Sequence, residues 1–295
     1  MMNNTPKVQI QAVLFNTPYE SVAKSVHSFS NAASRSNIEI TFRYGDSSPD
    51  KSLTDLNVNQ LRQTVLPSAF EYIHFDHNTG YGEGQNILAS DCTSDFILAI
   101  NPDIVVESTF FNHMLKPFSD DETVGIVEAR QTPLEHPKKY DKESGETSWA
   151  SGACMLTPTS LFKKLEGFDS DTFWMYCEDV DYSWRVKLAN RKVVYQPRAV
   201  AFHPKRLLED GNIAASKTEL FHSALSALLM AYKWSNEDLL HKYLSLFESS
   251  DDPYQRSAFA AFRKREATKT LPDRITAPAS VASFSSKGDY SENRY

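Results

Sequence analysis

The sequence predicts an α/β fold: a mostly parallel central sheet flanked by helices, followed by a C-terminal helical extension. Through the first two thirds of the chain, short β-rich runs alternate with segments of helical periodicity, which is the pattern of a parallel sheet. From about residue 206 onward, the helical pattern continues without strands. With 295 residues, the chain can bury one large hydrophobic core or two small ones.

Each predicted strand is short, rich in β-branched or aromatic residues, and followed by a polar turn. The last one, FILAI, is entirely apolar, which is typical of a central strand that is buried on both faces. The predicted strands are 8–15, 38–44, 72–75 and 96–100, and the helices predicted between them are 19–35 and 82–90.

A polar side chain follows each predicted strand, namely Asn16, Asp46, Asn78 and Asp103. Taken alone, an Asp or Asn after a strand is more often a turn residue or a helix cap than a ligand-binding residue. In open parallel sheets, however, ligands bind beyond the carboxyl ends of the strands. Four polar strand ends in register therefore predict a binding site at that edge.

The C-terminal third is predicted to be helical and then mobile. Helices are expected at 213–232 and 236–248, and the last stretch from residue 270 is rich in Ser, Ala and Pro and predicts a mobile tail. The basic segment 253–269 is interpreted either as an ordinary surface helix or as a contact with anionic lipid. The predicted division is 1–205 for the sheet domain, 206–250 for the helical extension, and 251–295 for the basic segment and tail.

Composition excludes several classes of function. The formal net charge of -7 argues against a nucleic-acid partner. Three widely spaced cysteines, Cys92, Cys154 and Cys177, predict neither a zinc site nor a disulfide framework, and reduced thiols are typical of a cytoplasmic protein. Because no secretory signal and no run of roughly 20 apolar residues is visible, membrane contact is expected only as a peripheral one.

The stretch HNTGYGEGQN at 77–86 places three glycines, Gly80, Gly82 and Gly84, before and within a predicted helix. Glycine lets the backbone approach a ligand without a Cβ clash. The spacing differs from the dinucleotide-binding fingerprint, and a flexible turn before a helix is the alternative interpretation. Asn86 on the helix offers both a hydrogen-bond donor and an acceptor.

The triplet Asn101-Pro102-Asp103 ends the most apolar strand, where a carboxylate can hold a divalent cation. Mg²⁺ or Mn²⁺ would use Asp103, take further ligands from phosphate and water, and offset charge on a diphosphate leaving group. His203, in AFHP after an apolar stretch, is the candidate second ligand, and a structural histidine is the alternative.

The segment FWMYCEDVDYSWR at 173–185 concentrates three carboxylates among aromatic rings. Its periodicity predicts a helix that starts near Glu178, where acidic residues are favoured by the helix dipole. Asp181 and Arg185 are four residues apart and can pair on that helix. The preceding aromatic run has no such explanation. Because rings stack on sugar faces, a carboxylate beside them predicts a base that takes a proton from a sugar hydroxyl.

The order of these pieces resembles the family 2 inverting glycosyltransferases of GT-A (Rossmann-like) fold, in particular the bacterial rhamnosyltransferase-like branch. The resemblance spans roughly residues 7–205. The matching pieces are LFN at 14–16, GDSSPD at 45–50, NTGYGEGQN at 78–86, FILAINPD at 96–103, SGACMLTP at 151–158, GFDSDTFWMYCEDVDYSWR at 167–185 and AFHP at 201–204.

The resemblance implies a role for each matched residue. Asp179 would be the general base, with Glu178 as the second choice, and Trp174 and Tyr176 would form the acceptor platform. Asp103 and His203 would hold the metal, although Asn101 stands where the family commonly has an acid. The residues that would bind the nucleotide-sugar are Asn16, Asp46, Asn78, Gly80, Asn86, Asn101 and Arg185.

The implied activity is a single displacement that transfers a sugar with inversion. The implied donor is dTDP-L-rhamnose, with a UDP-hexose next, and the acceptor would be a bacterial surface glycan, either free or on a polyprenyl diphosphate at the inner membrane face. The Gln-x-x-Arg-Trp motif of processive synthases is absent from the sequence, so one sugar is expected per acceptor encounter. A nucleotidyltransferase and a non-catalytic nucleotide-sugar or glycan-binding protein are the alternatives.

Overall fold

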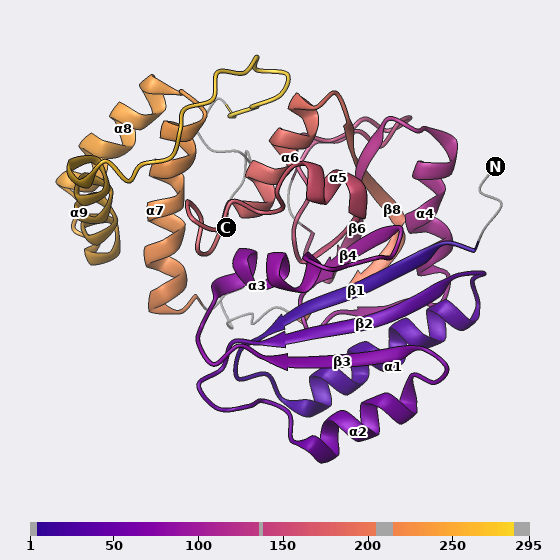
Figure 1. The fold of residues 1–295 in the computed structure, drawn as a ribbon. Helices are drawn as coiled ribbons and strands as arrows, with labels where there is room; N and C mark the ends of the chain where they lie inside the picture. The colour runs from indigo at the N-terminus through magenta and orange to yellow at the C-terminus, as the bar shows by residue number, and fades with distance from the viewer. Residues whose placement is uncertain (1–4, 136–137, 205–214, 286–295) are drawn as a thin grey trace.

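The computed structural model describes residues 5–135, 138–204 and 215–285 (Figure 1). Within these residues, eight strands form one sheet in the order β3-β2-β1-β4-β7-β6-β8-β5. The strands are β1 (Lys7–Leu14), β2 (Glu39–Asp46), β3 (Ala69–His74), β4 (Phe96–Ile100), β5 (Val105–Val106), β6 (Val124–Thr132), β7 (Cys154–Pro158) and β8 (Lys192–Phe202). The helices are α1 (Tyr19–Ser34), α2 (Asp55–Thr64), α3 (Gly80–Ala89), α4 (Phe110–Asp120), α5 (Thr159–Lys164), α6 (Glu178–Leu188), α7 (Lys217–Lys233), α8 (Glu237–Glu248) and α9 (Pro253–Thr268).

The sheet is parallel on one side and mixed on the other. Strands β3, β2, β1 and β4 pair in parallel, as predicted. Beyond them, β7 runs antiparallel to both β4 and β6, and β6 pairs in parallel with β8. The antiparallel β7 begins at the edge of the sheet where β4 ends, so residues 150–153, which precede β7, lie at that edge beside Asn101.

The two faces of the sheet have separate hydrophobic cores. Helices α1, α2 and α4 bury apolar side chains against one face, where the pleat of β1 presents Val8, Ile10, Ala12 and Leu14. Helices α3, α5 and α6 cover the opposite face, with Ile97 and Met155 from the sheet. This two-sided cover explains why β4 is apolar along its whole length.

The C-terminal helices share a third core with α6. Trp184 of α6 meets Trp234, just after α7, edge to face, with ring centroids 5.3 Å apart. Val180, Leu228 and Phe262 are buried in the same cluster. The predicted domain boundary at residue 205 stays a prediction, but the helical extension is packed directly on the helix that carries the three carboxylates.

The C-terminal segment differs from the predicted mobile tail over residues 270–285. The Ile275 amide donates to the Lys233 carbonyl at 2.6 Å, Arg274 pairs with Glu237 at 2.5 Å, and the Phe284 ring lies 4.9 Å from that of Trp184. A few apolar side chains spaced along a Ser, Ala and Pro-rich segment are enough to dock it onto an existing core. Residues 286–295 lie outside the described part of the chain.

The basic segment forms α9, and its two phenylalanines face inward. Phe262 is buried in the C-terminal core and Phe259 packs against it. This placement matches the interpretation of the segment as a surface helix that packs by one face. In the part of the chain that the structure describes, no helix is both long enough and apolar enough to cross a bilayer.

Candidate active site

The carboxyl ends of β1, β2 and β4 meet at one edge of the sheet, as the sequence predicts. Leu14 is in register with Asp46, and Ala12 is in register with Ile100. The loops that follow these strands are joined there, because the Asn16 amide donates to the Ser48 hydroxyl at 2.7 Å. Asn16 itself is exposed and has a positive φ of 49°.

Asp46 is buried and organises its own loop. Its carboxylate accepts hydrogen bonds from the amides of Ser48 and Ser52 and from the Tyr72 hydroxyl, at 3.0, 2.6 and 2.5 Å. Burial raises the pKa of Asp46, but the hydrogen bonds from Ser48, Tyr72 and Ser52 outweigh it and bring the pKa below its usual value. The predicted contact between Asp46 and the nucleotide stays a prediction, while its role in shaping the loop is visible.

The glycine-rich stretch forms the start of α3 and touches the aromatic run. Gly80 has a φ of 72°, and a Cβ at this position would lie 2.4 Å from the Trp174 carbonyl oxygen. Only glycine combines that backbone conformation with that approach. Asn78, which is exposed, accepts a hydrogen bond from the Gly80 amide at 3.0 Å. The predicted nucleotide-binding residues Asn78 and Gly80 thus lie beside the predicted acceptor platform.

Asn86 has a structural contact that the sequence does not reveal. Its amide nitrogen donates to the Phe168 carbonyl at 2.7 Å, and its amide oxygen accepts from the Phe168 amide at 2.9 Å. This two-way bond ties α3 to the loop that leads to α6. The nucleotide contact predicted for Asn86 stays a prediction.

The two predicted metal ligands, Asp103 and His203, lie together with Asn101, a predicted nucleotide-sugar-binding residue. The Asn101 amide nitrogen lies 3.2 Å from His203 Nε2, and Asp103 Oδ1 lies 3.8 Å from the same nitrogen. His203 Nδ1 lies 2.9 Å from Gln131 Oε1, an acceptor, so Nδ1 carries the proton and Nε2 the lone pair. Gln131, near the end of β6, was not a sequence prediction. Its hydrogen bond fixes the orientation of the histidine ring, as such bonds commonly do for histidines that bind metals.

This donor set fits a cation that takes most of its ligands from elsewhere. A carboxylate oxygen and an imidazole nitrogen suit Mn²⁺, and a carboxylate suits Mg²⁺. Among the described residues, no group of three or more His, Cys, Asp or Glu side chains could enclose a metal ion. The arrangement therefore fits a metal shared with phosphate and water rather than one caged by the protein.

The turn that precedes α6 has a strained backbone. Tyr176 and Cys177 both have positive φ values, 67° and 70°, although neither is glycine. Such conformations cost roughly 1–3 kcal/mol each and cluster at functional sites. They place Glu178 and Asp179 in the first turn of α6, which begins at Glu178 as predicted.

Asp179 is held by the loop before β7. One carboxylate oxygen accepts from the Gly152 amide at 2.8 Å, and the other accepts from the Val180 amide at 2.8 Å. Burial raises the pKa of Asp179, while the amides of Gly152 and Val180 and the charge of Lys138 oppose that rise. A carboxylate with a raised pKa and fixed geometry has the properties of a general base.

Glu178 is more buried and less satisfied than its neighbour. Its side-chain oxygen Oε2 is buried with no hydrogen-bond partner. Burial first, and the charge of Asp179 second, hold the pKa of Glu178 well above its usual value. The two adjacent carboxyls therefore differ in character, Glu178 favouring the protonated form and Asp179 the hydrogen-bonded one.

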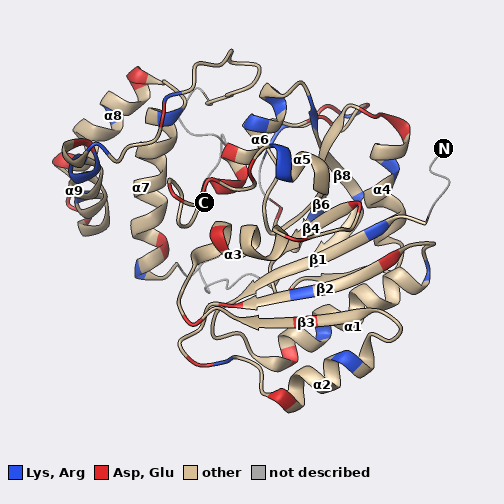
Figure 2. Cartoon of the chain, in the orientation of Figure 1, with Lys and Arg blue, Asp and Glu red and all other residues tan. Residues whose placement is uncertain are grey.

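Asp181, the third carboxylate, is a structural residue at the centre of an ionic network. Figure 2 shows that the helix that carries it, α6, has both acidic and basic residues. Asp181 is wholly buried and pairs with Arg185 at 2.7 Å, as predicted, and with Lys233 of α7 at 2.7 Å. Arg185 also donates to the carbonyls of Leu165 and Gly167, at 2.5 and 2.7 Å. The nucleotide contact predicted for Arg185 stays a prediction, and its visible role is to fix the loop before α6.

The predicted acceptor platform is supported by α7. The Trp174 ring lies 4.5 Å from that of His222, and the Tyr176 hydroxyl donates to Glu219 at 3.2 Å. Both partners lie in the first two turns of α7, beyond the segment that the family resemblance covers. The C-terminal extension therefore holds the two platform residues that the sequence predicted.

A short path of hydrogen bonds joins two parts of the candidate site. We call the part around Asp179 the base end, and the part around Asn101, Asp103 and His203 the metal end. The backbone amide of Asn101 donates to the Ala153 carbonyl at 2.9 Å. The backbone amide of the preceding residue, Gly152, donates to the Asp179 carboxylate. Tyr81 of α3 donates to the Gly152 carbonyl. Asp179 and the Asn101–Asp103 turn thus lie at the same edge of the sheet, as the predicted chemistry requires.

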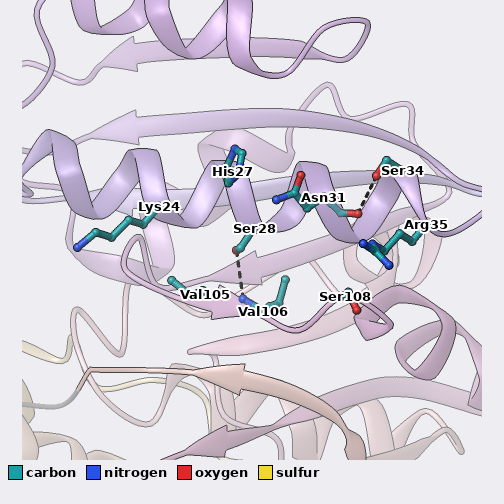
Figure 3. A pocket seen from close by; sticks show the side chains of 9 residues that line it. All are labelled: Lys24, His27, Ser28, Asn31, Ser34, Arg35, Val105, Val106 and Ser108. Carbon is teal, nitrogen blue, oxygen red and sulfur yellow. Dashed lines mark hydrogen bonds between the residues drawn. The ribbon is translucent and has the colours of Figure 1, made fainter.

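A groove of about 550 Å³ lies elsewhere, between α1 and β5 (Figure 3). Lys24, His27 and Arg35 line it from the helix, and Val105 and Val106 line it from the strand. None of the predicted catalytic, metal-binding or acceptor residues lines this groove.

Comparison with known proteins identifies the family. The sequence model of glycosyl transferase family 2 matches residues 12–184, which is more than half of the chain. The chain belongs to glycosyl transferase family 2. This family 2 chain is 26% identical to the rhamnosyltransferase WbbL of Escherichia coli K12, across 42% of the chain and 60% of WbbL.

Other relatives match shorter parts of their own length. An N-acetylglucosaminyl-diphospho-decaprenol L-rhamnosyltransferase of Mycobacterium tuberculosis is 35% identical over 28% of this chain and 24% of the relative. A pre-mycofactocin glycosyltransferase of the same species is 26% identical over 46% of the chain and 32% of the relative. The matched segments span less than two thirds of each curated relative.

Two solved structures show the GT-A fold of this family 2 chain. The mannosyltransferase PcManGT from Pyrobaculum calidifontis, in complex with GDP-Man and Mn²⁺, superposes with a TM-score of 0.58 over 90% of this chain and 76% of its own. GalNAc-T7 with UDP, GalNAc and Mn²⁺ superposes with a TM-score of 0.64 over 92% of this chain and 56% of its own. Both are 14% identical to the chain, so the likeness concerns the fold.

Proposed function

We propose that the protein is an inverting, non-processive glycosyltransferase that moves a sugar from a nucleotide-diphosphate donor to a hydroxyl of a glycan acceptor. The observation that carries this proposal is the position of Asp179. Its carboxylate is held by the Gly152 amide, one residue from the backbone bond that links Ala153 to Asn101. A base and a diphosphate-binding turn at one edge of the sheet are what a single displacement needs.

In the proposed mechanism, Asp179 accepts the proton of the acceptor hydroxyl. The oxygen attacks the anomeric carbon from the face opposite the nucleotide, the new C–O bond forms, and the bond to the diphosphate oxygen breaks with inversion. A divalent cation held by Asp103 and His203, Mn²⁺ or Mg²⁺, would offset the negative charge that builds on the diphosphate. Trp174 and Tyr176 stack on and orient the acceptor sugar.

The remaining predicted residues belong to donor binding. Asn78 and Gly80 lie beside the platform and are proposed to approach the diphosphate, with Asn101 next to the metal. The loops that carry Asn16 and Asp46 are proposed to contact the nucleoside. Asn86 and Arg185 are proposed to act through the loop that they hold.

For the donor, we propose dTDP-L-rhamnose, with a UDP-hexose as the alternative. Two of the relatives are named rhamnosyltransferases, and one of these names an acceptor on a decaprenol diphosphate. A glycan on a polyprenyl diphosphate at the inner face of the cytoplasmic membrane is therefore the proposed acceptor, which would require peripheral contact with that membrane.

A non-catalytic nucleotide-sugar-binding protein is the second candidate. The observation that favours it is that Asn101 is neutral. Only the Asp103 carboxylate and the His203 imidazole are then proposed as metal ligands. Such a protein would bind a donor without turning it over.

The test begins with donor binding and continues to transfer. Thermal shifts of the full chain with dTDP-rhamnose, UDP-glucose and UDP-N-acetylglucosamine, each with and without Mn²⁺, identify the donor. Transfer is then measured to an N-acetylglucosaminyl-diphospho-lipid, and the anomeric configuration of the product is read by NMR. Binding without transfer or donor hydrolysis would favour the second candidate, and a product with retained configuration would exclude the proposed displacement.

A further inference from the structure

A buried ion pair lies behind Asp179 and has no place in the mechanism above. Lys138, in the loop after β6, pairs with Glu128 of β6, and their side chains are 4% and 2% exposed. Burying two charges carries a desolvation penalty that often cancels their attraction. A pair of this kind is therefore weakly explained by stability alone.

The segment 149–152 connects this pair to Asp179. Lys138 Nζ donates to the Trp149 carbonyl at 3.0 Å and lies 3.8 Å from the centre of the Trp149 ring. Burial raises the pKa of Glu128, and the backbone of Ser151 opposes that rise by favouring the ionised form. The next amide, that of Gly152, donates to Asp179 at 2.8 Å. The same short segment thus contacts Lys138 at one end and Asp179 at the other.

The same segment also fixes the backbone of Asp179. The Ala150 amide donates to the Ser183 hydroxyl at 3.0 Å, and that hydroxyl donates to the Asp179 carbonyl at 2.7 Å. Residues 149–152 therefore bind the ion pair on one side and both the backbone and the side chain of Asp179 on the other.

The charged and titratable groups around Asp179 come from several elements. Glu178 is on its own helix, Tyr81 is on α3, and Lys138 and Glu128 lie behind the 149–152 segment. The positive charge of Lys138 lowers the pKa of Asp179, whereas Asp179 raises that of Glu128. The charge of Lys138 thus opposes the rise in the pKa of Asp179 that burial causes.

We propose that the buried Lys138–Glu128 pair is a positioning unit for the base Asp179, acting through the backbone of residues 149–152 and through the charge of Lys138. The pair does not touch substrate. It holds the Gly152 amide against Asp179, and the charge of Lys138 favours the ionised form of that carboxyl. The role of Asp179 as a base rests on the proposed function, whereas its coupling to Lys138 and Glu128 does not.

The test titrates the Asp179 carboxyl directly, so it needs no turnover. The full chain is labelled with ¹³C at aspartate side-chain carboxyls, and the Asp179 signal is assigned by its loss in Asp179→Asn. Lys138→Met is expected to raise the pKa of Asp179 by about one unit, because a nearby cation is removed. Glu128→Gln is expected to lower it, because a nearby anion is removed.

The opposite signs separate this role from a purely structural one. If the pair only supported the loop, both variants would loosen the Gly152 contact and move the pKa of Asp179 upward together, which would overturn the proposal. Lys142→Met removes an exposed lysine of the same loop, and solvent screening predicts no shift there. If the single variants do not fold, the uncharged double variant Glu128→Gln/Lys138→Met is examined. Its two charge effects on the pKa of Asp179 largely cancel, so the readout is hydrogen exchange at the Gly152 amide. Faster exchange is expected, and exchange as slow as in the wild type overturns the proposal.

Activity measurements then link the pair to the reaction. Where the wild-type protein transfers sugar, Lys138→Met is expected to move the acidic limb of the kcat/KM profile to higher pH by the same amount as the NMR titration, with donor KM unchanged. A wild-type protein that transfers no sugar removes the proposed function, while the NMR titration still decides the coupling.

Discussion

At the metal end of the candidate site, the side chains are partly open and sparsely bonded, whereas at the base end they are enclosed and densely connected. Asp103 is 31% exposed, and its ionic contact with His203 is a long one of 3.8 Å. Asp181, three residues beyond Glu178, is wholly buried and bonds to Arg185, Lys233 and Trp234. Between these extremes, Asp179 is half-buried and held through backbone amides.

The difference teaches how one edge of a sheet can serve two chemical tasks. A metal that is shared with substrate needs open coordination positions, so its protein ligands must remain accessible. A general base needs fixed geometry and a raised pKa, which both follow from burial and from hydrogen bonds to rigid backbone. The predictions below change one side chain at a time along this gradient.

The largest expected effect is on catalysis at Asp179. Asp179→Asn keeps the shape of the side chain but cannot accept the proton, so transfer should fall by about 10³-fold or more. Donor affinity should be unchanged, as measured by calorimetry. Asp171→Asn, which alters an exposed acid of the same segment, serves as the control. Turnover near the wild-type level in Asp179→Asn would remove this residue from the role.

Asp181→Asn should act on folding rather than on chemistry. It removes the carboxylate that the buried Lys233 and the half-buried Arg185 share, while Asp169 still pairs with Lys233. Breaking a buried pair costs about 3–5 kcal/mol. Urea denaturation measures the loss. A change below about 1 kcal/mol would mean that the network is dispensable, and the contrast between Asp179 and Asp181 would disappear.

Exchanging acid and amide at the metal end should change cation affinity in opposite directions. Asp103→Asn removes the carboxylate ligand and should weaken Mn²⁺ binding by about tenfold or more, whereas Asn101→Asp adds a carboxylate beside His203 and should tighten it. Calorimetric titration of Mn²⁺ in the presence of nucleoside diphosphate measures both. Equal affinity in the two variants would place the metal elsewhere.

The smallest expected effect concerns stability and pH at Glu178. Its pKa is raised in the folded state, above the unfolded value of about 4.3, so the folded protein binds more protons and loses stability as pH rises between those two values. Glu178→Gln cannot ionise and should escape that loss. The variant should therefore gain stability relative to the wild type from pH 4 to pH 7, as measured by urea denaturation at each pH. A stability difference between the variant and the wild type that stays constant from pH 4 to pH 7 would contradict the raised pKa of Glu178.

Much of the parallel half of the sheet was accessible from local sequence patterns. β4 was predicted with its bounds at 96–100, because an apolar run between polar turns has a single interpretation in an alternating chain. Helix α6 was likewise predicted to begin near Glu178 from its periodicity. The mixed half was not predicted. β6 and β7 pair with each other across a long loop, and a short stretch of sequence does not show which distant strand will be its partner.

The sequence by itself determined the order of the motifs and the polar strand ends, because these depend on residue type and local periodicity. It also indicated Asp103 and His203 as candidate metal ligands, while the family resemblance implied Asp179 as the candidate base. Only the tertiary structure decided what each carboxylate faces. Asn86 meets Phe168 across 82 residues, and Lys233 meets Asp169 across 64. The physical reason is that burial and hydrogen bonding, which set the pKa of an acid, come from elements distant in the chain. Three acids within four positions therefore have three environments: Glu178 is buried with a raised pKa, Asp179 is held by backbone amides, and Asp181 is the centre of an ionic network.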